Sequence, residues 1–220
     1  FFRKYNSNLK LKIPKIVETG YLRLDYLKKN SNLDGLINNS IVIAPTDYRH
    51  IENLSMFNDV EKIIKDLLLE TSFNIVFRPY PAIRSTLKTL KIKETYESNK
   101  RFKFDTSENY LEVYSKSTCM ITDISGTAYT YAFFTKKPVI FISKNEKFLK
   151  ELGYNKLDYF VDREKVGIII EDINEIKNNI KNILSIEKKT KPLNDLLEKE
   201  ITYLGKSKSR IFEQIENIEK

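Results

Sequence analysis

The stretch Thr118-Cys119-Met120-Ile121-Thr122-Asp123-Ile124-Ser125-Gly126-Thr127 leads from an apolar, β-rich run directly into a predicted helix. Residues 118–122 are typical of a buried strand, and the small and aromatic residues 125–134 indicate the helix. At the junction, Ser125 and Thr127 are of the types that cap free N–H groups, and Gly126 permits close approach of a ligand to the backbone. A strand that passes directly into a helix is the repeating unit of a parallel α/β sheet.

The same alternation continues on both sides of this stretch. It predicts further strands at residues 41–44, 74–77, 101–105, 139–142 and 166–170, and further helices at 60–70, 82–93, 108–116 and 173–184. Strands separated by helices imply right-handed crossovers. We therefore predict an α/β fold with a doubly wound parallel sheet, followed by C-terminal helices.

The length and composition suit one folded domain. The chain has 220 residues, of which 41% are hydrophobic and 31% charged, and this excludes a disordered or low-complexity protein. We divide the domain into a basic lead-in (1–38), a Rossmann-like core (39–185) and a helical tail (186–220). No apolar run approaches the roughly 18 residues of a membrane-spanning helix, and no signal peptide is visible.

The net charge of +8 is unevenly distributed. Residues 1–30 and 76–103 each carry eight Lys or Arg against two acids. Such patches indicate an anionic partner, namely a nucleic acid, a phosphorylated metabolite or an acidic lipid surface, although solvated lysine-rich faces are also common.

The sheet topology predicts where a ligand would bind, because ligands of open parallel sheets lie beyond the carboxyl ends of the strands. This rule selects the loops 45–50, 78–84 and 123–127. The third loop offers helix N–H groups and a helix dipole to a phosphate, or it is only a good helix cap. Arg78 and Arg84 in the second loop are either a clamp for a phosphate or carboxylate, or two exposed charges.

Other chemistries lack support in the sequence. Neither the dinucleotide fingerprint G-x-G-x-x-G nor the phosphate loop G-x-x-x-x-G-K-[ST] occurs. His50 is the only histidine and Cys119 the only cysteine, so we expect no catalytic triad, no metal site and no disulfide. We also expect no cofactor.

Several motifs together resemble a known family. They are Thr19 to Asp25, Ala44-Pro45-Thr46 with Arg49, Arg78-Pro79-Tyr80-Pro81, Thr122 to Thr127, Lys137-Pro138-Val139-Ile140-Phe141 and Tyr203-Leu204-Gly205-Lys206-Ser207. Their order and spacing resemble the C-terminal, nucleotide-binding half of the CDP-glycerol glycerophosphotransferases, which polymerise teichoic acids and related capsule polymers. The resemblance covers residues 15–215.

The resemblance implies a GT-B architecture, in which two Rossmann-like lobes enclose the active site. This chain would be the donor lobe, and the acceptor lobe with the catalytic base would precede Phe1. The fragment alone would then be inactive, and we assign no catalytic residue. The resemblance further implies a CDP-glycerol donor, a lipid-linked or polymeric acceptor bound through the other lobe, and no nucleic acid. It implies a cytoplasmic location, with peripheral contact at the inner membrane face for a lipid-linked acceptor.

The resemblance also assigns residues to the phosphates of the donor. Ser125, with the N–H groups of Gly126 and Thr127, would hold the pyrophosphate, and Asp123 would shape the turn.

The remaining assignments concern the transferred group and the walls of the site. Arg78 and Tyr80 would address the transferred phosphoryl group, and the walls would be formed by Thr46, Arg49, Arg84 and Thr130.

The sequence departs from the family pattern at three positions. Tyr80 stands where the family usually has His, Gly126 where it has a second Ser, and Thr130 where it has Asp. These departures leave alternatives open: another CDP-polyol donor, a nucleotide-sugar glycosyltransferase of capsule or surface polysaccharide synthesis, or a non-catalytic or nucleic-acid-binding α/β module.

Overall fold

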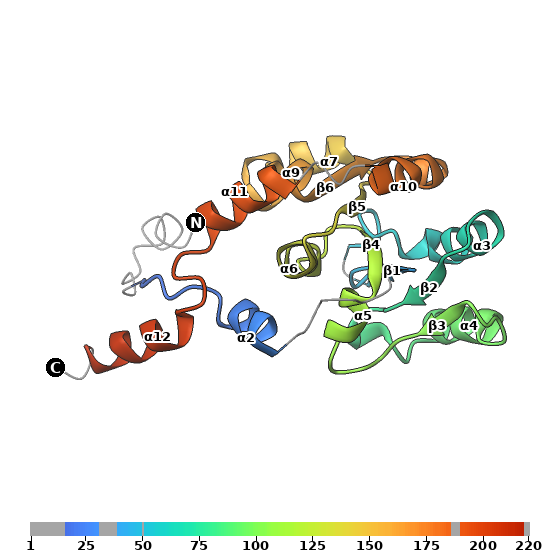
Figure 1. Cartoon of the computed structure of the whole chain (residues 1–220). Coiled ribbons are helices and arrows are strands. Elements are labelled where there is room, and N and C mark those ends of the chain that lie inside the picture. Colours follow the sequence, from blue (N-terminus) through green and yellow to red (C-terminus); the bar gives the residue numbers. More distant parts are fainter. Residues whose placement is uncertain (1–15, 31–38, 50, 186–189, 218–220) are drawn as a thin grey trace.

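The computed structural model describes residues 16–30, 39–49, 51–185 and 190–217, and within them six strands form one parallel sheet (Figure 1). The sheet order is β3-β2-β1-β4-β5-β6. The strands are β1 (Ser40–Ala44), β2 (Asn74–Phe77), β3 (Phe102–Phe104), β4 (Ser117–Thr122), β5 (Val139–Ile142) and β6 (Gly167–Ile170). This order is that of a doubly wound Rossmann-like sheet, so the predicted fold class is confirmed.

Helices cover the sheet and connect its strands. Within the described residues they are α2 (Leu22–Asn30), α3 (Val60–Glu70), α4 (Leu87–Tyr96), α5 (Leu111–Ser115), α6 (Thr127–Thr135), α7 (Glu146–Glu151), α8 (Asp158–Val161), α9 (Arg163–Val166), α10 (Ile176–Ser185), α11 (Thr190–Glu200) and α12 (Ser207–Glu216). Single 3-10 turns are η1 (Phe57–Asp59), η2 (Pro81–Ile83), η3 (Tyr154–Lys156) and η4 (Ile173–Glu175).

The side chains of strand β1 contribute to two hydrophobic cores, one on each face of the sheet. Its side chains are buried throughout and alternate between the two faces of the sheet. Ile41 and Ile43 pack with α3 and α10 on one face, and Val42 and Ala44 pack with α6 and α11 on the other. Both faces are therefore covered, as a continuous apolar strand requires.

Four helices begin later than the sequence pattern predicts. Helix α6 begins at Thr127 rather than at residue 125, and α10 begins at Ile176 rather than at residue 173, where a 3-10 turn precedes it. Helix α4 begins at Leu87 rather than at residue 82, because Pro81 opens a 3-10 turn and the Thr86 hydroxyl caps the helix by accepting from the N–H of Thr89. Helix α5 begins at Leu111 rather than at residue 108, and the Asn109 side chain accepts from its first N–H (3.1 Å).

Parts of the predicted lead-in, the predicted tail and His50 lie outside the described residues. The proposed division into lead-in, core and tail stays a prediction.

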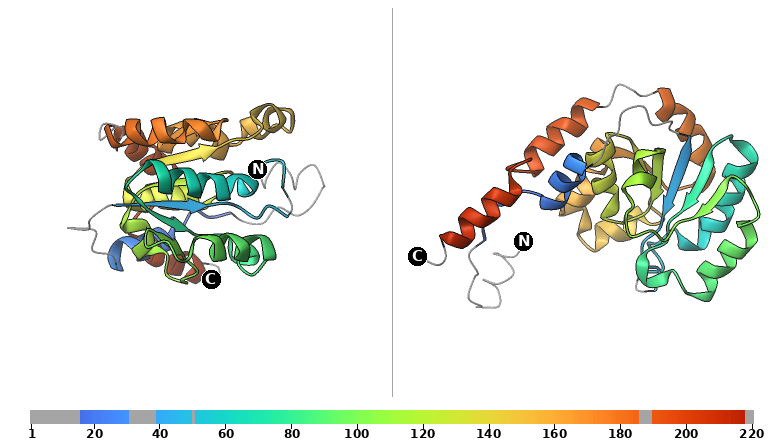
Figure 2. Two further views of the ribbon diagram at one scale, coloured as in Figure 1. Left: turned by 90° about the vertical axis from the view of Figure 1, so that its right-hand side faces the viewer. Right: turned by 60° about the horizontal axis from the view of Figure 1, so that its bottom comes forward.

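Segments from the two ends of the described chain meet in what we call the clasp, formed by residues 19–25 and 203–207 (Figure 2). The Asp25 carboxylate accepts hydrogen bonds from the N–H groups of Gly205 (2.6 Å) and Ser207 (2.9 Å), 180 and 182 residues away. Gly20 has φ +87°, and a Cβ there would lie 2.4 Å from the Ser207 hydroxyl oxygen, so this close approach requires glycine. The clasp holds α2 against α12 and α6.

A substitution at Gly167 tests whether β5 and β6 lie as close together as the structure shows. A Cβ at this position would lie 1.9 Å from the carbonyl oxygen of Val139. We expect Gly167→Ala to lower the free energy of unfolding by about 1–3 kcal/mol, measured by urea denaturation, because the backbone must shift. Gly126→Ala is the matched control, since its added Cβ has no neighbour within 4 Å and its φ is -60°. Equal stability of the two variants would contradict this account of β6.

Candidate functional site

The candidate site lies beyond the carboxyl ends of β1 and β4, which are neighbours at the centre of the sheet. From β1 the chain passes to α3 on one face, and from β4 it passes to α6 on the other. In such sheets a ligand ordinarily lies between the two connections at this reversal, and we call this place the crevice. Two of the three loops selected from the sequence flank it, through the described residues 45–49 and through 123–127.

Asp123 joins these two loops. Its side chain is buried, and its carboxylate accepts from the N–H of Thr46 (3.0 Å), the N–H of Met56 (3.0 Å) and the Ser55 hydroxyl (3.1 Å). Burial raises the pKa of Asp123 to about 6, although these hydrogen bonds favour the carboxylate. Asp123 therefore shapes the loop that follows β1 as well as ending β4, and Ser55 and Met56 are members of this network that the sequence did not suggest.

The start of α6 is open to solvent. Gly126 is the N-cap residue, it is exposed, and no side chain caps the helix. A Cβ at Gly126 would have no atom within 4 Å. The first turn of α6 thus presents N–H groups and the positive end of the helix dipole to open space, which suits an anion.

Tyrosines support this turn from two sides. The hydroxyl of Tyr159, in α8, donates to the carbonyl of Ser125 (3.0 Å), and burial holds the pKa of Tyr159 well above its usual value, so the phenol stays a donor. The hydroxyls of Tyr114 and Thr127 share a hydrogen bond (2.6 Å). Neither contact was predicted from the sequence, because each joins the turn to a residue distant along the chain.

Arg78 lies beside the same turn but is engaged by protein groups. It forms an ion pair with buried Asp105 and donates to the carbonyl of Ser107 (2.9 Å), and its side chain is only 10% exposed. It also lies over the ring of Tyr110, 5.5 Å from the centroid. A phosphate bound here would share Arg78 with Asp105.

The other predicted residues are more widely spread. Arg49 is exposed and forms a bidentate ion pair with Asp47 (2.9 and 2.6 Å). Arg84 donates to the carbonyl of Thr106 (3.1 Å), and Tyr80 is 46% exposed. These three residues belong to the loops after β1 and β2 rather than to the turn at Gly126.

Thr130, predicted as part of a wall, lies one helical turn beyond Thr127. Its hydroxyl shares a hydrogen bond with the hydroxyl of Tyr21 (2.9 Å), which precedes α2. Thr130 therefore joins α6 to the clasp.

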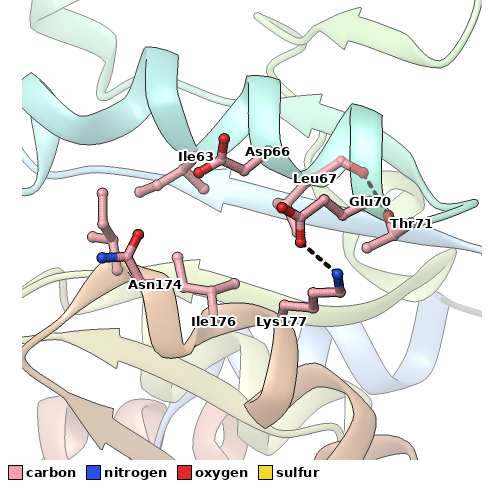
Figure 3. A pocket seen from close by; sticks show the side chains of 9 residues that line it. Ile63, Asp66, Leu67, Glu70, Thr71, Asn174, Ile176 and Lys177 are labelled. Carbon is pink, nitrogen blue, oxygen red and sulfur yellow. Dashed lines mark hydrogen bonds and ion pairs between the residues drawn. The ribbon is translucent and has the colours of Figure 1, made fainter.

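A separate groove of about 170 Å³ lies between α3 and α10 (Figure 3). Apolar side chains such as Ile63 and Leu67 line it, and its charged groups are paired, Lys177 with Glu70 (2.8 Å) and Asp66 with Lys62 (2.7 Å). The crevice at β1 and β4 is the better candidate for an anionic ligand, because the open start of α6 lies there.

The parallel sheet in the order β3-β2-β1-β4-β5-β6, with helices on both faces, defines a Rossmann-like α/β domain. The family model of CDP-glycerol:poly(glycerophosphate) glycerophosphotransferases matches residues 3–217, and the chain belongs to this family. The resemblance drawn from the sequence motifs is thereby confirmed.

The chain is also similar to individual proteins in sequence or in fold. The minor teichoic acid biosynthesis protein GgaB of Bacillus subtilis (strain 168) is 24% identical over 219 residues, covering 82% of this chain and 23% of GgaB. The structure of the wall teichoic acid polymerase TagF is similar with a TM-score of 0.60 and 18% identity, over 96% of this chain and 54% of TagF. A UDP-GlcNAc 2-epimerase of Methanocaldococcus jannaschii gives a TM-score of 0.58 and 16% identity, over 98% of this chain and 58% of the epimerase. At these identities the solved structures establish the fold, and this chain spans only part of each relative.

Asp123 predicts a particular pH dependence of stability. Its folded-state pKa of about 6 lies above the ordinary value of 3.8, so the folded chain binds the proton more tightly than the unfolded chain. The contribution of Asp123 to the free energy of unfolding therefore falls as the pH rises from about 4 to about 6, by on the order of 3 kcal/mol, and is constant above about pH 7. Urea denaturation between pH 4.5 and 8 should show wild type losing stability relative to Asp123→Asn, whose side chain does not titrate. Parallel pH profiles would contradict the raised pKa.

Proposed function

We propose that this chain is the donor-binding domain of a transferase that moves glycerol phosphate, or a related polyol phosphate, from a CDP-activated donor to a teichoic-acid-type polymer. The observation that carries the proposal is the uncapped, exposed start of α6 at the crevice, in a member of a glycerophosphotransferase family. A structure of a TagF variant soaked with CDPG supports CDP-glycerol as the donor class.

The geometry suits the phosphates of such a donor. The diphosphate would lie against the N–H groups of Gly126 and Thr127, with Ser125 at the turn and Arg78 beside it. The acceptor hydroxyl would attack the phosphorus that carries glycerol, and CMP would leave with the bond to the bridging oxygen broken. Charge then accumulates on the CMP phosphate, where the helix start stabilises it, so the site works by positioning and neutralising charge.

The acceptor side of the reaction belongs to the proposal as well. The catalytic base and the binding site for a lipid-linked or polymeric acceptor would come from a second lobe. Contact with the inner membrane face would be peripheral, and in the described part of the chain no helix is long and apolar enough to cross a bilayer.

One alternative donor class has a specific observation in its favour. Tyr80 stands where the family usually has His, and a phenol, unlike an imidazole, has no cationic form to offer a phosphate. The epimerase with a similar fold was solved with UDP-GlcNAc and UDP. A nucleotide sugar is therefore the second candidate donor.

Ligand-induced stabilisation tests the proposal on the 220-residue chain. CDP-glycerol at a hundredfold excess over its dissociation constant should raise the free energy of unfolding by about 2.7 kcal/mol, seen as a higher melting temperature. A larger shift with UDP-GlcNAc would favour the nucleotide sugar. A salt-dependent shift with single-stranded oligonucleotides alone would favour a nucleic-acid-binding module. No shift with any CDP, UDP or GDP conjugate would refute the donor-binding proposal.

A pair of variants at Gly126 tests whether the donor phosphates bind at this residue. Gly126→Asp and Gly126→Asn add side chains of nearly equal size, and both residue types are good N-caps, so both variants should fold. The aspartate places a negative charge where the diphosphate would bind. We expect it to weaken CDP-glycerol binding at least about tenfold more than the asparagine does. Equal affinity of the two variants would place the phosphates elsewhere.

A further inference from the structure

We infer that Arg23, in the first turn of α2, is an additional phosphate-binding residue of this site and supplies charge that Arg78 and Arg49, each paired with an aspartate, do not. The inference rests on the proposed function, because it names a further residue for the same diphosphate. Its evidence comes from the clasp and from a chain of contacts that ends at α6.

The clasp fixes α2 beside the start of α6. Asp25 holds the helix by its two hydrogen bonds to the segment 203–207, and Tyr21 shares a hydrogen bond with Thr130. On the opposite side of the helix from solvent, Leu24 and Leu27 are buried in the core formed with α6. Arg23 lies between these anchors and is exposed.

Contacts lead from Arg23 to the open helix start. The Arg23 guanidinium lies over the ring of Tyr110, 4.6 Å from its centroid, and Arg78 lies over the same ring at 5.5 Å. Tyr110 packs against Tyr114 with ring centroids 4.8 Å apart, and the Tyr114 hydroxyl meets the Thr127 hydroxyl at 2.6 Å. Two guanidinium groups therefore gather around one aromatic ring, next to the first turn of α6.

Arg23 differs from Arg78 and Arg49 in whether a carboxylate neutralises its charge. Asp105 pairs with Arg78, and Asp47 pairs with Arg49 in the loop after β1. Among the residues that the structure describes, no carboxylate lies within ion-pair distance of Arg23. A diphosphate at Gly126 would thus find in Arg23 a positive charge that no carboxylate of the described residues pairs with.

The chemistry of arginine suits this position. The Arg23 guanidinium interacts with Tyr110 both over the ring and at its hydroxyl, and a guanidinium carries five N–H donors, so donors remain for phosphate oxygens. Such charge-assisted bonds are stronger than those between neutral groups. The stacked ring also holds the long side chain in place, so less rotamer entropy is lost on binding.

Calorimetric titrations of the 220-residue chain test the inference with four ligands: CDP-glycerol, inorganic pyrophosphate, CMP and cytidine. The variants are Arg23→Gln, Arg23→Lys and the control Lys29→Gln, which removes the same charge from an exposed site on the same helix. We expect Arg23→Gln to weaken CDP-glycerol and pyrophosphate about ten- to a hundredfold, CMP less, and cytidine not at all. Arg23→Lys should keep part of the affinity, and Lys29→Gln should stay within about twofold of wild type.

The possible outcomes distinguish a failure of the inference about Arg23 from a failure of the proposed function. Unchanged pyrophosphate affinity in Arg23→Gln would overturn the inference. A loss of cytidine affinity equal to the loss of pyrophosphate affinity would also overturn it, because Arg23 would then have a structural role only. Arg23-dependent binding of pyrophosphate without binding of CDP-glycerol would uphold the anion site and refute the proposed donor. Binding of neither by wild type would overturn both. Equal melting temperatures of Arg23→Gln and Lys29→Gln without ligand would confirm that the fold is intact.

Discussion

The buried carboxylate of Asp123 is the constraint on which the site depends. A charged group removed from water must be compensated, and three donors from the loop after β1 compensate it. This requirement ties that loop to the end of β4, and it leaves the following residues, Ser125 and Gly126, at the rim of the crevice. The buried aspartate and the open start of α6 thus lie three residues apart, at the same edge of the sheet.

Much of the fold could be predicted from the sequence, because its central strands are continuous apolar runs. Residues 41–44 and 139–142 have no polar face, which only a sheet covered on both sides allows. The crevice followed from the sheet topology alone. The helices between β5 and β6 could not be predicted, since α7, α8 and α9 are 6, 4 and 4 residues long and too short to show a helical period.

The site was predicted less completely than the fold, for an electrostatic reason. The sequence shows where arginines occur, but it does not show which carboxylates neutralise them. Arg78 and Arg49 have acidic partners in the folded chain, whereas Arg23 lies against an aromatic ring. Tyr159 was missed for a related reason, because its contact with Ser125 is made across 34 residues by a segment without a regular pattern.

The clasp has a consequence for the order of events during synthesis. Asp25 is made well before its partners, because the N–H groups that it binds belong to residues 180 and 182 positions later in the chain. The central sheet can assemble in the meantime, while α2 lacks one of its anchors. The nascent chain would thus form a Rossmann-like core first. Helix α2, which carries Arg23, would take its final position only after translation has passed Ser207.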